Sequence, residues 1–473
     1  MGTRRNRLDH ARRGLALELR PLVSLAAPVV ATEVSWTTMG LISTMMVGRV
    51  SAEAIGAVSL GNSLFFAVAV FGLGMLLGLD YTVAHAFGAG RIGESHRALL
   101  QGVYLSFALA ALLSGLFWFA LPLLDGLGIE PEVLSLARPY LHALIWSLPP
   151  LLLSAALRRY LQAMGKVRPV MITAVSADLV AVVACWALVF GHLGAPAMGA
   201  EGAGWAICLS RGYVLLSLLL YLLIDERSSP TGLRHTPLRP DLGRLGRLVG
   251  LGFPSAMQLT FEVGVFATAT TLVARLDAQS LAAHQIALSA ASFTFMVPLG
   301  IASAAAVRVG QAMGRSDSAA AGRAGWTALL LGASFMACAA IAFVVFPHAI
   351  ARAFTIDQRV IETSVALLAV AALFQMFDGI QVVATGALRG TGDTRTAMVV
   401  SLLCYWLIGL PVGYALCFVG GKGVVGIWLG LSVGLIGVAL TLLRFWARRM
   451  RALGDRRGLP SRAALEPVEL AAS

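Results

Sequence analysis

Long apolar stretches, separated by short polar loops, follow one another along nearly the whole chain. A helix rises about 1.5 Å per residue, so about 20 consecutive apolar residues are needed to cross a bilayer. Twelve segments meet this requirement, at 21–47, 54–78, 97–121, 138–162, 169–191, 202–224, 245–275, 281–306, 322–346, 361–388, 396–419 and 423–446. The pattern predicts an all-α integral membrane protein with twelve transmembrane helices.

The two halves of this pattern resemble each other in sequence. Leu22 to Pro28 (LVSLAAP) matches Leu248 to Pro254 (LVGLGFP), and an offset of 226 residues relates the two segments. Each half holds six predicted spans, so the repeats have the same orientation and are related by an axis along the membrane normal. Two such halves around a midplane cavity are typical of transporters. We expect a leader at 1–20, an N-lobe at 21–224, a linker at 225–244, a C-lobe at 245–447 and a tail at 448–473.

The composition agrees with a membrane protein. Of the 473 residues, 58% are hydrophobic and 13% are charged, whereas soluble domains carry about 25% charged residues. Most of the 36 Lys and Arg residues lie in the leader, in every second loop and in the tail. Basic residues stay on the cytoplasmic side, so we expect both termini to be cytoplasmic. This distribution explains the net charge of +12, and no nucleic-acid partner is expected.

Several other classes of protein are disfavoured by the sequence. The first apolar run, after the Arg-rich leader, is longer than the apolar core of a cleavable signal peptide, which is about 7–15 residues. A Walker A motif is absent, so nothing indicates transport driven by ATP. The Asp, Glu and His residues inside the spans do not cluster in sequence as the groups of an active site would. We therefore expect neither an enzyme nor a bound cofactor.

Glu262 and Asp378 stand out against the apolar background. They lie near the middle of the seventh and tenth predicted spans, both in the C-lobe, and neither span has a Lys or Arg near its centre. An acidic side chain at the bilayer centre costs about 2.5–3.5 kcal/mol on insertion scales, so such residues usually face a cavity or a partner. The pair indicates a cation site, for a proton or a metal ion, with a protonated and purely structural role as the alternative.

Other side chains in the spans are weaker candidates. Phe374 and Phe377 flank the tenth-span acid and could contact a cation through their ring faces, with ordinary packing as the alternative. Glu33 and Asp178 could line a cavity in the N-lobe or make structural polar contacts.

Polar residues near the predicted span ends have simpler alternatives. Asp80 closes the second span near the expected cytoplasmic face, where it would act as a helix cap or as an intracellular gate. Arg211 is alone in the sixth span, and a pairing with Asp178 is one arrangement that the sequence does not decide. His284 and Gln285 begin the eighth span near the expected outer face, where a hydrogen-bonded helix end is the simpler interpretation.

Several motifs are specific enough to compare with a known family. They are the stretch from Pro254 to Glu262, AAHQIAL at 282–288, VRVGQ at 307–311, DGIQ at 378–381, LRG at 388–390 and, in the N-terminal half, MGLISTMMVGR at 39–49 and the segment 157–169. They resemble the multidrug and toxic compound extrusion (MATE) family, in the bacterial branch with a Glu in the seventh span and an Asp in the tenth. The match covers roughly residues 20–447.

The resemblance has consequences for fold and function. It implies two six-helix lobes that form a V around a central cavity, and export of organic cations and drugs in exchange for Na⁺ or H⁺ without ATP. Glu262 and Asp378 match the acids of that branch and would be the cation-coupling residues, and also the metal ligands if Na⁺ is the coupling ion. Gln285, Ser289 and Gln381 join the candidates for the cavity and substrate surface.

The sequence departs from the family pattern at three positions. Ser43 stands where many members of the branch have an acid in the first span, so Glu33 or Asp178 would have to substitute for it in the N-lobe. Phe374 stands where a Tyr is often found one turn before the tenth-span Asp, and Ser289 stands where an Asn is expected. Ser43 thereby also becomes a candidate cavity residue.

We therefore predict a secondary active efflux transporter that works by alternating access, in a bacterial inner membrane and as a monomer. The nearest alternative is a flippase for a lipid-linked saccharide of the same superfamily. An anionic pyrophosphate head would favour Arg or Lys inside the cavity, whereas the sequence offers acids. A receptor or an intramembrane enzyme would need a large extramembrane domain or a clustered nucleophile and base, and neither is evident.

Overall fold

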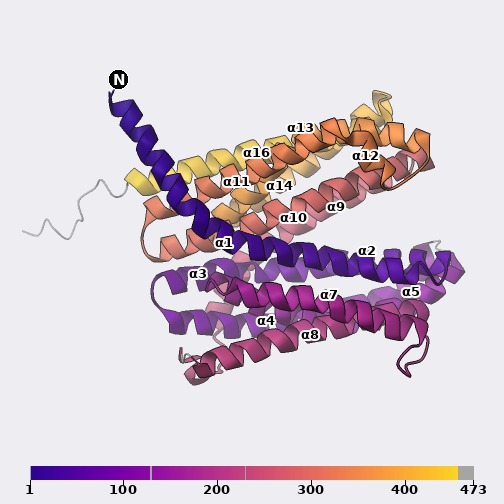
Figure 1. The fold of residues 1–473 in the computed structure, drawn as a ribbon, viewed down its shortest axis with the longest axis horizontal. Helices are drawn as coiled ribbons and strands as arrows, with labels where there is room; N and C mark the ends of the chain where they lie inside the picture. The colour runs from indigo at the N-terminus through magenta and orange to yellow at the C-terminus, as the bar shows by residue number, and fades with distance from the viewer. Residues whose placement is uncertain (1, 128–129, 229–230, 456–473) are drawn as a thin grey trace, which may run out of the picture.

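The computed structural model describes residues 2–127, 130–228 and 231–455, and these residues form a set of long helices (Figure 1). Within these described residues, eleven helices are long and apolar enough to cross a membrane, and the number is twelve when the bent pair α5–α6 is counted as one span. Each of the twelve predicted segments corresponds to one of these spans. The predicted fold class, an all-α integral membrane protein, is therefore confirmed.

The described residues of the first half of the chain form eight α-helices. They are α1 (Gly2–Val47), α2 (Ala52–Leu76), α3 (Gly78–Gly88), α4 (Ile92–Ala120), α5 (Pro131–Trp146), α6 (Leu148–Ala163), α7 (Val167–Phe190) and α8 (Gly199–Ser228), with the short 3₁₀-helix η1 (Leu121–Leu127) after α4. The helices α2 and α3 together form one span, whereas α5 and α6 meet at 41°. Two prolines follow the first residue of α6, and sharp helix bends usually occur at proline.

The second half begins after the 3₁₀-turn η2 (Leu233–His235). Its elements are α9 (Leu242–Val273), α10 (Ala278–Gly314), α11 (Ser318–Val345), α12 (Pro347–Arg352), α13 (Gln358–Gly390), α14 (Arg395–Ser401), η3 (Leu402–Gly409), α15 (Leu410–Tyr414), η4 (Ala415–Val419) and α16 (Gly423–Asp455). The elements from α14 to η4 form one span, in which η3 and η4 are π-helical.

Helical structure extends beyond the predicted spans. Residues 2–20, predicted as a leader, belong to α1, and α8 runs four residues into the predicted linker before the undescribed residues 229–230. Residues 448–455 of the predicted tail belong to α16, while 456–473 lie outside the described residues.

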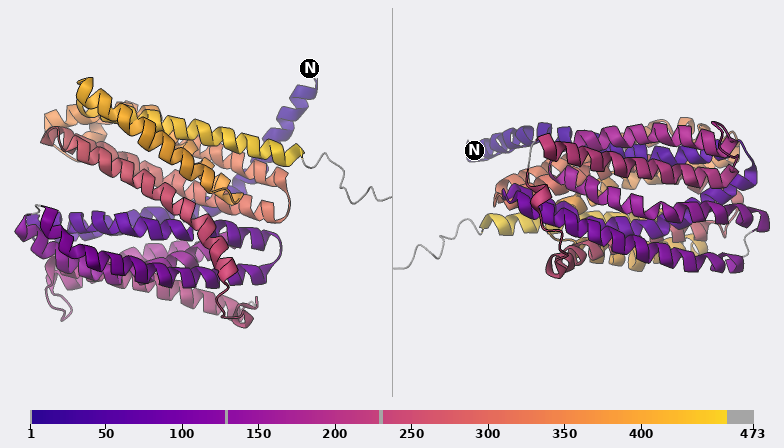
Figure 2. Two further views of the ribbon diagram at one scale, coloured as in Figure 1. Left: turned by 180° about the vertical axis from the view of Figure 1, so that it is seen from behind. Right: turned by 90° about the horizontal axis from the view of Figure 1, so that it is seen from below.

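The two halves form two helix bundles that meet at an angle (Figures 1 and 2). One bundle contains α1–α8 and the other α9–α16. They converge at the end where α1 begins and α16 finishes, which we name the terminal end, and diverge toward the opposite, distal end, where α12 lies. Large apolar side chains such as Phe119 and Leu179 are exposed on the outside, as expected for a surface that contacts lipid.

Glycines bring the two lobes into close contact near the terminal end. A Cβ atom on Gly88 of α3 would lie 2.1 Å from the carbonyl oxygen of Gln311 on α10, and one on Gly314 of α10 would lie 2.1 Å from that of His85 on α3. The repeat offset of 226 residues carries Gly88 onto Gly314 and His85 onto Gln311. The two contacts are therefore equivalent, and the surface is symmetric about the axis that relates the lobes. We name this surface between α3 and α10 the lobe seam.

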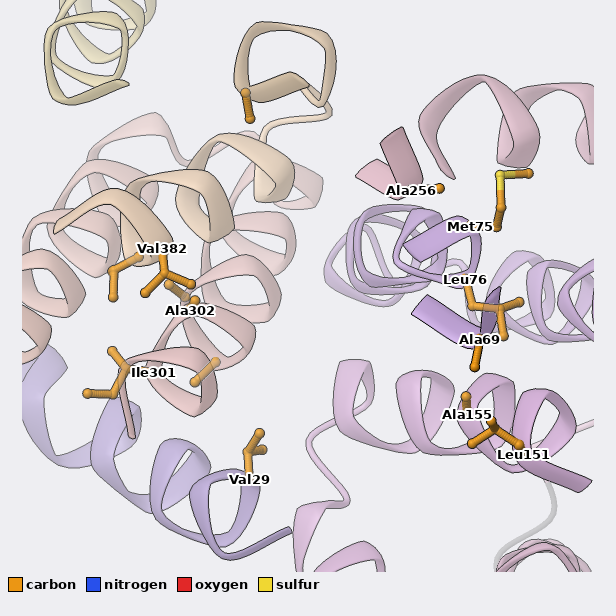
Figure 3. Close-up of a cluster of buried hydrophobic side chains, with 14 of the residues drawn as sticks. Val29, Ala69, Met75, Leu76, Leu151, Ala155, Ala256, Ile301, Ala302 and Val382 are labelled. Atoms are coloured by element: carbon orange, nitrogen blue, oxygen red, sulfur yellow. The ribbon is translucent and has the colours of Figure 1, made fainter. Parts of the chain in front are cut away.

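The same symmetry holds for the contacts on either side of the lobe seam. Gly74 of α2 packs against Ala256 of α9, and Gly300 of α10 packs against Val30 of α1. The offset of 226 carries Gly74 onto Gly300 and Val30 onto Ala256, so these two contacts are also equivalent. Figure 3 shows Ala256 beside Met75 of α2. One apolar core is therefore shared by both lobes, and small residues permit the close approach of their helices, as is usual in membranes.

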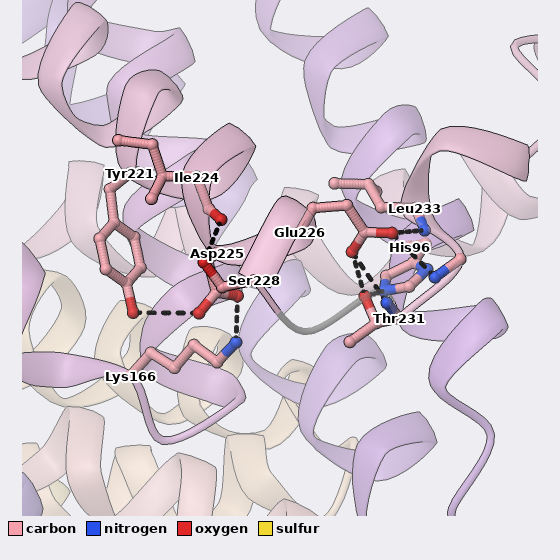
Figure 4. A network of polar contacts seen from close by, with 10 residues as sticks. His96, Lys166, Tyr221, Ile224, Asp225, Glu226, Ser228, Thr231 and Leu233 are labelled. Atoms are coloured by element: carbon pink, nitrogen blue, oxygen red, sulfur yellow. Dashed lines mark hydrogen bonds and ion pairs between the residues drawn. The ribbon is translucent and has the colours of Figure 1, made fainter.

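The connection between the lobes is held against the N-lobe by partly buried polar contacts (Figure 4). The carboxylate of Glu226, at the end of α8, accepts hydrogen bonds from the backbone N–H groups of Thr231 and Leu233 at 3.1 and 2.9 Å, and from the Thr231 hydroxyl at 2.6 Å. Lys166, between α6 and α7, pairs with Asp225. Asp225, Glu226, Thr231 and Leu233 lie in the predicted linker, so the linker is ordered where it is described.

Aspartates cap the first two helices of the C-lobe. Asp241 accepts a hydrogen bond from the N–H of Arg244 at 3.0 Å, and Asp277 accepts one from the N–H of Ser280 at 2.7 Å. These backbone contacts hold the pKa of each carboxyl group below its ordinary value. Both groups therefore stay ionised in the loops, where they complement the positive ends of α9 and α10.

Candidate functional site

Glu262 on α9 and Asp378 on α13 lie close together inside the C-lobe. The Asp378 side chain is 9% exposed and Glu262 is half-buried, and the two carboxylates are near enough to repel each other. No Lys, Arg or His in the described part of the chain forms an ion pair with either group. Two like charges without a counter-charge in apolar surroundings are unfavourable, so this pair favours binding of a cation.

Polar side chains from three elements surround the two acids. Gln258 lies one turn before Glu262, and its Nε2 is 3.4 Å from Oε2 of that carboxylate. Gln381 lies three residues after Asp378 and is positioned beside Glu262. Tyr405, on the π-helical segment η3, is near both acids. Spacings of three and four residues put the members of each helical pair on one face, and π-helical turns are frequent at functional sites.

Two members of this group have unmet hydrogen-bonding capacity. Both amide atoms of Gln381 and the hydroxyl of Tyr405 are completely buried, and none makes a hydrogen bond of normal geometry within the described residues. A buried polar group without a partner costs about 1–3 kcal/mol. Carboxylate, amide and phenol oxygens are hard donors that suit an alkali cation, and the carboxylates can also take a proton. The group therefore offers oxygen ligands for an alkali cation and carboxylates for a proton.

The aromatic candidates pack into the C-lobe beside this site. The ring of Phe374 is 4% exposed and stacks on Trp428, with 5.9 Å between ring centroids. The indole N–H of Trp428 donates to Nδ1 of His284 at 3.0 Å, and Nε2 of His284 is 2.9 Å from the Thr270 hydroxyl. Phe374 thus has one ring face covered by packing. Phe377 is half-buried against the same core.

The remaining C-lobe candidates lie on a different helix. Gln285 and Ser289 are both exposed on α10, one turn apart. They do not belong to the group around the two acids. Their partner in the sequence motif, His284, is completely buried and fixes α10 to α16 through Trp428.

The two N-lobe acids have local partners. Glu33 is 3.3 Å from Arg158, and both side chains are largely buried. Asp178 is half-buried, and its Oδ2 is 2.6 Å from the hydroxyl of Ser35. Glu33 is therefore neutralised by an arginine, unlike the acids of the C-lobe.

Ser43, at the position where the family pattern has an acid, is completely buried. It lies beside the Tyr140 hydroxyl, which donates a hydrogen bond of 2.7 Å to Oδ1 of Asn62. These three neutral side chains form a polar contact among α1, α2 and α5. The N-lobe therefore has no acidic pair equivalent to that of the C-lobe within the residues that the structure describes.

Asp80 lies between the lobes at the terminal end. Its carboxylate, 1% exposed, is 3.6 Å from Arg159 of the N-lobe and 3.1 Å from Arg389 of the C-lobe. Arg159 also donates a 3.0 Å hydrogen bond to Ser303 on α10. One aspartate and two arginines thus connect α3, α6 and α13, next to the lobe seam.

Some partners of the predicted site residues were not identified from the sequence. Gln258 follows from helical spacing, because it precedes Glu262 by four residues. Tyr405 and Arg389 approach their acids from other helices, and no spacing in the sequence indicates this. Arg158 lies within α6 and pairs with Glu33 from another helix, which no spacing in the sequence indicates either.

Comparison with known proteins gives consistent matches along the chain. A model of the family described as MatE matches residues 28–187 and 254–415. A probable multidrug resistance protein NorM of Mesorhizobium japonicum is 37% identical over 441 residues, covering 92% of this chain and 94% of the relative. Multidrug resistance protein NorM of Aliivibrio fischeri is 34% identical over 438 residues, covering 91% and 95%.

Solved structures match at lower identity. The eukaryotic MATE transporter AtDTX14 superposes with a TM-score of 0.82 at 23% identity, covering 94% of this chain and 99% of that one. A MOP superfamily transporter from Pyrococcus furiosus superposes with a TM-score of 0.83 at 17% identity, covering 92% and 96%. These structures share the two-lobed helical fold described above.

Proposed function

The chain belongs to the MatE family, and from this premise we propose that it is a secondary active multidrug efflux transporter that exchanges Na⁺ or H⁺ for organic cations. It is a multi-pass membrane transporter and not an enzyme. The observation that carries the proposed coupling is the pair Glu262 and Asp378, which share a buried site without a basic partner among the described residues. We infer no cofactor beyond the coupling ion.

Exchange requires that ion and substrate favour opposite states of the transporter. In the proposed cycle a cation enters from outside and neutralises Glu262 and Asp378. A cationic amphiphile binds from inside and leaves on the outside when the acids are reloaded. An ion can shift the equilibrium between two states only by its difference in affinity for them, so the two acids must bind the ion more tightly in one state. Gln258, Gln381 and Tyr405 are the neighbours whose rearrangement would change that affinity.

We propose that the terminal end is cytoplasmic in a bacterial inner membrane and that the transporter works as a monomer. The clustering of Lys and Arg in the loops of that end supports this orientation. The lobes meet at the terminal end and diverge at the distal end (Figure 2), so the conformation corresponds to an outward-open state. Asp80 with Arg159 and Arg389 would then be part of the closed inner gate.

The Asp80 group gives a test of this gate. Asp80→Asn leaves Arg159 and Arg389 buried without their shared anion, and removal of one partner of a buried ion pair costs about 3–5 kcal/mol. We expect a lower melting temperature of the purified protein and weaker efflux. Adding Arg389→Gln should restore part of the stability, because it removes one unmatched charge. Melting curves that coincide for wild type and Asp80→Asn would contradict a stabilising role.

The overall proposal is tested by following a fluorescent cationic dye in cells with and without the protein. We expect lower dye accumulation in cells with the protein, and a dependence of this difference on either Na⁺ or external pH. Measurements in Na⁺ and in Na⁺-free buffer, each at two pH values, separate the two coupling ions. Equal accumulation in all conditions would contradict drug export and favour the lipid-linked saccharide flippase.

A further inference from the structure

The N-lobe contains a partly open cavity that is separate from the two C-lobe acids. Its volume is about 50 Å³, and it lies among α1, α6, α7 and α8, with Trp36, Ser154, Arg158 and Arg211 among its lining residues. A cavity needs about 10–15 Å³ to hold one water, so this one has room for a few waters or for one small ion. Two arginines on the wall of such a small apolar space are unusual in a membrane.

Arg211 brings a positive charge to this cavity without a compensating acid. Its side chain is 8% exposed, and no carboxylate of the described residues lies within ion-pair distance. One terminal nitrogen donates a hydrogen bond to Ser147, while Nε has no partner. A guanidinium has five N–H donors, so most of its capacity is unused by the side chains around it.

Aromatic rings hold the guanidinium in place. Its central carbon is 4.6 Å from the ring centroid of Phe65 and 5.4 Å from that of Trp36. Such contacts stabilise the cation and fix its plane, but they satisfy no N–H donor. Arg211 is therefore oriented and desolvated. Its Nε is completely buried, so only its terminal N–H groups can donate to a molecule in the cavity.

The acids near the cavity do not cancel this charge. Glu33 forms an ion pair with Arg158, with 3.3 Å between the two groups. The Ser35 hydroxyl lies 2.6 Å from Asp178 and 2.9 Å from the carbonyl oxygen of Ala174. Both contacts have the Ser35 hydroxyl as the donor, so Asp178 is bound by a neutral side chain. Neither acid forms an ion pair with Arg211, so its guanidinium has no carboxylate in contact among the described residues.

We propose that this N-lobe cavity is a binding site for a small monovalent anion, a halide or a compact carboxylate such as acetate, held by the terminal N–H groups of Arg211. The anion supplies the missing charge and accepts the hydrogen bonds that the surrounding side chains leave unmade. The inference does not rest on drug export or on the nature of the coupling ion, because it concerns binding to a different lobe.

Bromide binding to the purified full-length protein tests this site. Trp36 lies against Arg211, and bromide quenches indole fluorescence at short range, so a bound bromide should quench Trp36. Bromide replaces gluconate, which is too large for the cavity, at constant ionic strength. We expect quenching that saturates, and the saturating part should disappear in Trp36→Phe. Arg211→Gln should weaken the apparent affinity at least about tenfold, as expected for the loss of a charged hydrogen-bond donor.

Two further variants and one competition complete the design. Arg211→Lys keeps the positive charge but loses the planar guanidinium, so it should bind bromide with intermediate affinity. This variant still tests the site if Arg211→Gln does not fold. The exposed Arg275→Gln is the matched control and should bind like wild type. Acetate that raises the bromide midpoint identifies a site that accepts carboxylates, whereas an unchanged midpoint identifies a halide site. Quenching that is linear in bromide and equal in wild type and both Arg211 variants would overturn the proposal and leave a cavity that holds only water.

Discussion

Asp378→Asn is expected to abolish ion-driven efflux while the protein remains folded in the membrane. The amide has nearly the shape of the carboxylate, so the packing around α13 should persist. It cannot carry the negative charge or exchange a proton, and the site then keeps only one of its two acids. The affinity difference that drives exchange is lost with that charge. Dye extrusion should fall to the level of cells without the protein, at equal amounts of protein in the membrane.

The same helix supplies a matched control for this variant. Glu362 is exposed on α13, so Glu362→Gln makes an equivalent change of charge sixteen residues before Asp378 and should leave efflux unchanged. Glu262→Gln should behave like Asp378→Asn, and the double variant should be no worse than either single one, because residues that act as one unit are not additive. Undiminished extrusion by Asp378→Asn would exclude the proposed coupling site.

The sequence predicted the architecture well because the relevant forces are local. Each span is identified by its own apolar length, and the repeat by a constant offset. The bend between α5 and α6 was missed, since Pro149 and Pro150 fall inside an apolar run that is long enough to cross the membrane as one helix. Helix ends were also missed at α1 and α16, because polar residues continue a helix beyond the bilayer without an apolar signal.

The candidate site was predicted in part for a related reason. The cost of an acid at the membrane centre singles out Glu262 and Asp378 without any structure. The same argument applied to Glu33 does not distinguish a cavity residue from one that is neutralised, because its partner Arg158 lies on another helix. Contacts such as Tyr405 near both acids, or Asp80 between two arginines, depend on how the helices pack. Helix packing in lipid is governed by small residues that are abundant throughout this chain.

The second large effect is expected from a cross-link through the lobe seam. Ala84 on α3 and Gly310 on α10 are related by the repeat offset of 226, so this pair lies on the axis between the lobes. A Cβ atom on Gly310 would be 3.0 Å from the Cβ of Ala84. A disulfide needs a Cβ–Cβ distance of about 3.5–4.5 Å, which a small separation of the two helices provides. Cysteines at both positions should therefore oxidise to a bond that joins the lobes.

This bond should stop transport reversibly, because alternating access requires the terminal end to open. In a background with the five native cysteines replaced, the double variant Ala84→Cys with Gly310→Cys is expected to lose dye extrusion on oxidation and to regain it on reduction. Each single cysteine variant should be insensitive to oxidant. These controls distinguish the effect of the disulfide from the effect of placing a larger side chain at Gly310. If the cross-linked protein still extrudes dye, the lobes do not part at this seam, and export must proceed through another movement. The native contacts Gly88–Gln311 and Gly314–His85 would then be permanent contacts between the lobes and not one closed state of an inner gate.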